Sequence, residues 1–300
     1  MTRFALATAV LVLCFAAPLY DLIWFAATSE FHSYILLIPF ISVYLVWLKK
    51  EGIPIGSRPA GKSAAAFFAL GALALIAYWL LLRPRLKLVE DDYLALMMAA
   101  FLLCFVGVCC RSWGRDTLRA SAFPLALLIF MVPIPAFAMP LIDSFLQHGS
   151  AAAAQGFFIL ADTPFLRTGL IFQLPGIRPI QVARECSGIQ SSMVLLITGL
   201  VASYLFLRRP RNQILLTLLM IPLGLLRNGF RIFTIGELCV HIGPQMIDSP
   251  IHRKGGPIFF ALSLIPLFIL LVVLQRSERS RGKIKSETVE DQNPAPKPPK

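Results

Sequence analysis

The feature that most constrains this chain is a series of apolar runs, each close to twenty residues long, that recurs through its 300 residues. Hydrophobic side chains make up 57% of the composition, and charged ones are scarce within the runs. A helix of about 20 apolar residues spans the ~30 Å hydrocarbon core of a bilayer. Lipid offers no hydrogen-bond partner to the backbone, so such runs cross as helices and not as open sheet. The sequence therefore predicts an all-α polytopic membrane protein.

The runs predict about eight transmembrane helices, in one membrane-embedded domain over residues 1–275. The first run continues to residue 26, beyond the usual apolar core of a signal peptide, so we expect an uncleaved helix there. Residues 276–300 are charged and Pro-rich, which predicts a disordered cytoplasmic tail. The eight predicted spans are 4–26, 32–48, 63–82, 93–110, 121–138, 187–207, 213–235 and 257–275.

The basic residues are unevenly distributed between the loops of this arrangement. Of 28 Lys and Arg residues, 18 fall before the first span, in the loops after spans two, four and six, and after residue 275. Eight fall in the opposite loops, and the last two, Arg227 and Arg231, lie within the seventh span. Because Lys and Arg collect in cytoplasmic loops, both termini are predicted to be cytoplasmic. The net charge of +12 follows this pattern, so membrane lipids and not nucleic acid are the expected partners.

The longest loop on the outer side, residues 139–186, contains two kinds of pattern. Residues 140–162 predict a short extracytoplasmic helix at the membrane surface or re-entering it. Residues 169–185 have β-prone runs on both sides of Leu-Pro-Gly and predict a β-hairpin. This hairpin would lead the chain to Cys186 at the outer mouth of the sixth span.

Cys186 is followed by a Ser-Gly pair at the predicted start of a helix. As part of the first helical turn, its sulfur would lie at the positive end of the helix dipole, which favours the reactive thiolate. Arg231 is expected in the last outer turns of the seventh span, and His252 in the next outer loop. A guanidinium there would stabilise an oxyanion, and an imidazole would transfer protons. We therefore predict that Cys186, Arg231 and His252 meet at one depth on the outer side.

Three further residues are expected to support this group. Arg227 and Asn228 share the helical face of Arg231 and suggest an interior polar lining, and Glu185 precedes the cysteine. Each of the three main residues also has an ordinary explanation. A cysteine at a helix start is often packing filler, an arginine near a helix end snorkels to the interface, and a loop histidine is usually solvated.

The remaining cysteines and histidines suggest no cofactor. The six cysteines show no paired metal-ligand spacing and no disulfide framework, and we expect no metal site. Asp21 is expected to face water or pack between helices, and His32 opens the second span without an assigned catalytic role. The cysteines are Cys14, Cys104, Cys109, Cys110, Cys186 and Cys239.

Several segments resemble the exosortase/archaeosortase membrane transpeptidases. The similarity is carried by "ECSGIQSS", by "RNGFRI" and by the later His252 with its Gly-Gly, and it extends to "FHSYILLIPFISVYLVW" and "MVPIPAF". The glycine spacing after His252 is loosely matched, and "FHSY" replaces the usual Ser-His-Gly order. The resemblance implies that Cys186 is the family's nucleophile, that Arg231 matches the arginine of its Arg block and that His252 matches the histidine of its His block.

The resemblance implies a cysteine protease-transpeptidase at the outer face of the cytoplasmic membrane. Its partners would be secreted proteins whose C-terminal sorting signal combines a short motif, of Pro-Glu-Pro type in many bacterial members, with an apolar helix and a basic cluster. The acceptor is not identified by the sequence, with a lipid and a polysaccharide as candidates. The alternative interpretation is a transporter or flippase for an anionic lipid-linked substrate, and a third is a non-enzymatic assembly subunit.

Overall fold

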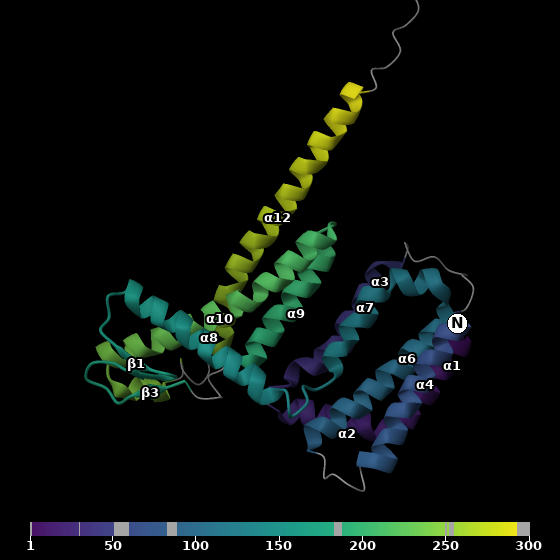
Figure 1. Cartoon of the computed structure of the whole chain (residues 1–300), viewed down its shortest axis with the longest axis horizontal. Helices are drawn as coiled ribbons and strands as arrows, with labels where there is room; N and C mark the ends of the chain where they lie inside the picture. Colours follow the sequence, from purple (N-terminus) through teal and green to yellow (C-terminus); the bar gives the residue numbers. More distant parts are fainter. Residues whose placement is uncertain are drawn as a thin grey trace, which may run out of the picture. The chain divides into compact units, whose positions relative to one another are not determined.

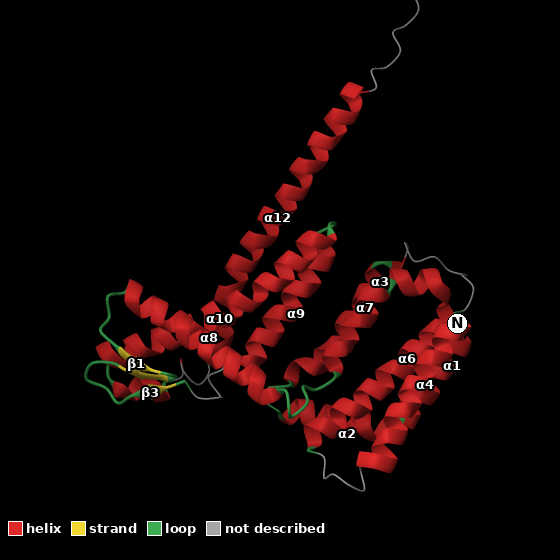
Figure 2. Ribbon diagram, in the orientation of Figure 1, coloured by secondary structure: helices red, strands yellow, loops and turns green. Residues whose placement is uncertain are grey.

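The computed structural model describes residues 2–29, 31–50, 60–82, 89–182, 188–249, 251 and 255–292. These residues form two compact units, Met1–Ile142 and Asp143–Lys300. Helices dominate both units, and the strands are confined to the second (Figure 2). Five described helices are long and apolar enough to cross a membrane, or six if one bent pair counts as a single span. The protein is therefore a multi-pass helical membrane protein.

The N-terminal unit is built entirely of helices among its described residues. α6 packs against α4, where Gly107 faces the ring of Phe68, and α3 is joined to α7 by Ser42 Oγ, which donates to the carbonyl of Pro124 at 2.8 Å. The elements are α1 (Thr2–Cys14), α2 (Ala16–Thr28), η1 (Ser33–Leu37), α3 (Ile38–Leu48), α4 (Gly61–Ala77), η3 (Tyr78–Leu82), α6 (Glu90–Ala120), α7 (Ala122–Leu127) and η4 (Leu128–Met131).

The second unit contains a helical hairpin and a small sheet (Figure 1). α9 and α10 are antiparallel neighbours joined by a short turn, and α12 packs against both. β2 pairs antiparallel with both β1 and β3. The elements are α8 (Met139–Leu160), β1 (Leu166–Thr168), β2 (Ile171–Gln173), β3 (Ile180–Gln181), α9 (Ile189–Phe206), α10 (Pro210–His241), η6 (Pro244–Asp248) and α12 (Gly256–Gln292).

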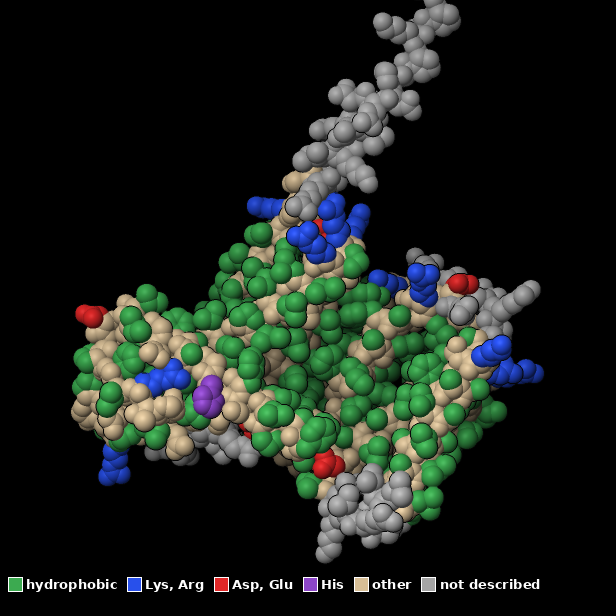
Figure 3. Space-filling model, viewed as in Figure 1, with side chains coloured by type: hydrophobic (Ala, Val, Ile, Leu, Met, Phe, Trp, Pro, Cys, Tyr) green, Lys and Arg blue, Asp and Glu red, His purple; other side chains and the backbone are tan. Residues whose placement is uncertain are grey.

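Two apolar cores hold the second unit together. One fills the space between α9, α10 and α12, where Leu195, Leu216 and Leu267 are completely buried. The other lies between α8 and the sheet, where Phe158 and Phe172 are buried with their ring centres 5.5 Å apart. The outward faces of the helices are also apolar (Figure 3), as expected for surfaces that contact lipid.

Two of the eight predicted spans contain only short apolar helices in the described residues. The segment predicted as 121–138 forms a helix over Ala122–Met131 only, because Pro133 and Pro135 follow and cannot donate backbone hydrogen bonds. A ten-residue helix is about 15 Å long, half of a hydrocarbon core. The segment predicted as 32–48 forms the short helix Ser33–Leu48. The first predicted span is bent by 71° between α1 and α2. The count of eight crossings therefore stays a prediction.

Two helices extend further than the sequence predicts. α10 continues to His241 instead of ending at 235. α12 continues to Gln292 through much of the segment predicted to be a disordered tail, where Arg, Lys and Glu, all good helix formers, are frequent. Thirty-two residues make α10 about 48 Å long, longer than the hydrocarbon core.

Candidate functional site

The start of α9 lies against the polar face of α10. Gly188 caps α9 with φ 71° and ψ 22°, in the left-handed region. A Cβ at Gly188 would lie 2.8 Å from Asn228 Oδ1 and 3.0 Å from Arg227 Nη2. Any larger residue would therefore displace these side chains as well as strain the backbone. Glycine is required here both by the dihedral angle and by the close approach of α10.

Arg227 is almost completely buried, with 6% of its surface exposed. Its Nη2 donates to Ser191 Oγ at 2.5 Å, and Ser191 Oγ donates in turn to the carbonyl oxygen of Gly188 at 3.1 Å. Arg227 Nε and Nη1 have no hydrogen-bond partner among the described residues. This chain of bonds ties the start of α9 to a buried positive charge on α10.

Asn228 connects α10 to α8. The side chain is 1% exposed, and its Nδ2 donates to Ser150 Oγ at 3.1 Å. One residue further, a Cβ at Gly229 would lie 2.5 Å from Ala153 Cβ and 2.9 Å from the carbonyl oxygen of Ser150. Small residues on both helices thus allow their backbones to approach closely, as is common between membrane helices. The contact fixes the rotation of α10 and the direction of its polar face.

Arg231, one helical turn after Arg227, borders a small cavity of about 50 Å³. The side chain is half-buried. Asn228 and Gln181 also line the cavity, so three polar residues share it with walls that are otherwise aliphatic. The remaining lining residues are Ile180, Val182, Ile232, Ile235 and Ile247. The cavity therefore joins the last strand of the sheet, the polar face of α10 and the loop after it.

The structure does not describe every residue predicted for the site. Cys186, Glu185 and His252 lie outside the described residues. Arg231 and Asn228 are brought together at the cavity, with Arg227 beside them at Gly188. α9 begins at Ile189, two residues after the predicted start of the sixth span at 187, and follows the left-handed Gly188. The prediction that Cys186 belongs to the first turn of a helix falls outside the described residues and stays a prediction.

His32 belongs to the N-terminal unit and is 3% exposed. Its Nδ1 lies 3.1 Å from Ser29 Oγ, and its ring packs on Phe25 with centres 4.9 Å apart. These contacts account for the ring of His32 by packing within the N-terminal unit.

The structure also identifies two residues to which the sequence analysis gave no role. Ser150 and Ser191 supply the hydrogen-bond partners of Asn228 and Arg227. Ser191 lies within the quoted "ECSGIQSS" segment, and Ser150 lies in a run of small residues on α8. Spacing alone could not pair them with α10, because both contacts depend on how the helices pack.

A family model described as transmembrane exosortase matches residues 24–269. The match covers most of the chain and includes every residue discussed for the site. The chain belongs to the transmembrane exosortase family. Comparisons with curated proteins and with solved structures gave no match. In this exosortase, the segment predicted to carry the cysteine is flanked by Val182 and Gly188, and both flanks contact the arginine-bearing helix α10 or its cavity.

Proposed function

We propose that this exosortase is a cysteine protease-transpeptidase that cleaves membrane-tethered proteins at a short C-terminal sorting motif. Cys186 is the nucleophile, Arg231 the oxyanion-stabilising group and His252 the general acid and base, with Asn228, Glu185 and Arg227 in supporting roles. The product is transferred to an acceptor at the outer face of the cytoplasmic membrane.

The observation that carries this proposal is the position of the two flanks. Val182 lines the cavity of Arg231, and Gly188 contacts Asn228 and Arg227. Only five residues separate these two flanks in the sequence. The proposal therefore places the thiol of Cys186 beside the polar face of α10.

The lengths of the helices support a site at a membrane surface. Arg231 is 21 residues from the start of α10, or about 31 Å along the helix, which matches the thickness of the hydrocarbon core. Gly188 precedes an 18-residue α9, about 27 Å long, that runs back to the same turn. The Arg-rich turn at 208–211 is the predicted cytoplasmic end, so the site belongs to the outer surface.

The proposed reaction is acyl transfer through a thioester. His252 takes the proton of the Cys186 thiol, and the resulting thiolate attacks the carbonyl carbon of the scissile bond, so that the carbonyl electrons move to oxygen, where Arg231 stabilises the charge. The C–N bond then breaks, and His252 returns the proton to the leaving amine. An acceptor amine or hydroxyl, deprotonated by His252, displaces the sulfur and forms the new bond, and His252 gives that proton to the released thiolate. Anchoring enzyme and substrate in one membrane contributes the proximity that this step needs.

The test is a processing assay with a membrane-tethered reporter that ends in a Pro-Glu-Pro type motif, an apolar helix and a basic cluster. Cys186→Ala and Cys186→Ser should insert normally and leave the reporter uncleaved. Cys14, an exposed free cysteine of α1, provides the matched control, and Cys14→Ala should process at the wild-type rate. Full processing by Cys186→Ala would exclude the nucleophile. Mass spectrometry of a substrate trapped on Cys186 would identify the cleaved bond.

A further inference from the structure

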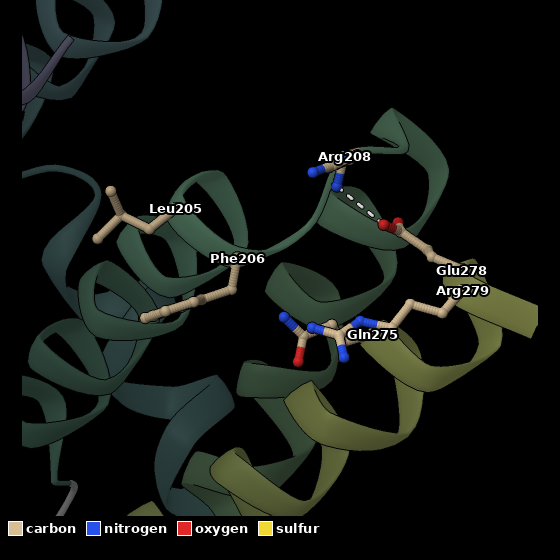
Figure 4. Close-up of a pocket in the computed structure, with 6 residues that line it drawn as sticks. All are labelled: Leu205, Phe206, Arg208, Gln275, Glu278 and Arg279. Carbon is tan, nitrogen blue, oxygen red and sulfur yellow. Dashed lines mark hydrogen bonds between the residues drawn. The ribbon is translucent and has the colours of Figure 1, made fainter. Parts of the chain in front are cut away.

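A second and larger cavity lies at the opposite end of α9 from Gly188. Its volume is about 420 Å³. Figure 4 shows side chains from the end of α9 and from α12 around it, with Gln275 and Arg279 close together. The lining residues are Leu205, Phe206, Arg208, Gln275, Glu278 and Arg279. None of these residues belongs to the proposed catalytic group.

Among the described lining residues, the only carboxylate is already engaged at the start of α10. Glu278 accepts hydrogen bonds from the backbone N–H groups of Arg208 and Arg209, at 2.9 and 3.0 Å, and from Asn212 Nδ2 at 3.0 Å. It thus satisfies donors at the start of a helix, where negative charge is favoured. In the described part of the chain, no side-chain hydrogen bond engages the guanidinium groups of Arg208 and Arg279. Both remain available to a ligand.

The surroundings of the cavity are strongly basic. Residues 205–212 and 275–280 contain five arginines and one acidic residue. Figure 3 shows Lys and Arg side chains gathered at this end of the helices. This end of the unit therefore favours a negatively charged ligand.

The cavity also lies at the depth of a lipid headgroup. Gln275 is 19 residues from the start of α12, and this distance along the helix, about 29 Å, equals one hydrocarbon core. Phe206 is 51% exposed at the cavity, and Val272 and Val273 on α12 are 42% and 57% exposed. Cationic and lipid-facing apolar groups thus meet at one boundary, which matches a molecule with an anionic head and an acyl tail better than a free anion.

We propose that this cavity binds the phosphate of an anionic phospholipid from the cytoplasmic leaflet. Arg208 and Arg279 hold the phosphate oxygens, because the planar guanidinium fork matches two oxygens of one phosphate. The amide of Gln275 is placed to bind a hydroxyl of the headgroup, and Phe206 faces the first part of an acyl chain. Basic pockets between helices on this side of membranes commonly bind such headgroups.

The test uses the full chain in nanodiscs of phosphatidylcholine with a minor fraction of phosphatidylglycerol, and native mass spectrometry counts the retained phosphatidylglycerol. Each hydrogen bond to the charged phosphate contributes at least about a tenfold preference, so Arg208→Gln with Arg279→Gln should weaken retention about 100-fold. Arg211→Gln with Arg276→Gln removes the same charge outside the cavity lining and should retain nearly wild-type binding. Equal losses in both pairs would show bulk attraction, and no loss in the first pair would exclude the site.

A second measurement needs no variant. Photoactivatable phosphatidylglycerol should crosslink to peptides containing 205–208 or 275–279 of the wild-type chain, and the same label on phosphatidylcholine should not. Crosslinks confined to other segments would overturn the proposal. Inorganic phosphate at millimolar concentration should leave the crosslink in place. Complete displacement by inorganic phosphate would assign the cavity to a free anion and refute a lipid ligand.

Discussion

The substitution Gly188→Ala tests whether the contact between the start of α9 and the face of α10 is needed for activity. The dihedral φ of 71° costs an alanine about 1–2 kcal/mol. In addition, the new Cβ would lie 2.8 Å from Asn228 Oδ1 and 3.0 Å from Arg227 Nη2, so both side chains must move. The bond of Asn228 to Ser150 is worth about 1 kcal/mol, and the charged bond of Arg227 to Ser191 about 1.5–3 kcal/mol. The total expected cost is roughly 3.5–6 kcal/mol.

The matched control is Gly176→Ala. Gly176 has φ 73°, but no atom lies within 4 Å of a Cβ built there. This variant therefore carries only the dihedral cost of about 1–2 kcal/mol. Comparing the two alanine variants isolates the contact with α10 from the strain of a left-handed residue.

The assay combines reporter processing with the midpoint of thermal unfolding in detergent. Gly188→Ala should lower the processing rate at least 100-fold. This factor corresponds to an activation free energy raised by about 2.7 kcal/mol, because the reacting groups would be misplaced. Gly176→Ala should process within a few-fold of the wild type and lower the midpoint by only a few degrees. If Gly188→Ala were no more impaired than Gly176→Ala, the packing of α9 on α10 would not position the reacting groups, and the structural argument for the site would fail.

Two further outcomes are expected. Arg231→Lys keeps the charge but loses the planar guanidinium fork, so the processing rate should fall at least tenfold. The control Arg211→Lys, at an exposed position, should leave the rate unchanged. Equal rates in the two variants would remove Arg231 from the mechanism. Glu278→Ala removes three hydrogen bonds at the start of α10. It should destabilise the protein by about 1 kcal/mol without slowing processing of the reporter. An unchanged midpoint of thermal unfolding would contradict this capping role.

Much of the architecture follows from local sequence properties. Apolar runs of sufficient length predict helices, because in lipid the backbone must form all of its hydrogen bonds within the segment. The helix period alone places Arg227 and Arg231 on one face. The same local patterns could not predict the ends of the elements. Pro133 and Pro135 shorten the helix that ends at Met131, whereas α10 extends to His241. Strand β1 was not predicted, because its three residues gain their partners only by pairing with β2.

The chemical groups of the site were predicted from sequence, since residue type determines what a side chain can donate, accept or transfer. Only the tertiary structure decided which neighbours those groups have. Ser150 is 78 positions from Asn228, and Ser191 is 36 positions from Arg227, so no local pattern links them. The pairs form because α8, α9 and α10 approach closely at small residues, and the depth at which helices meet depends on the packing of whole surfaces. Sequence thus determined the membrane class and predicted the reactive groups, and packing determined which described residues became neighbours.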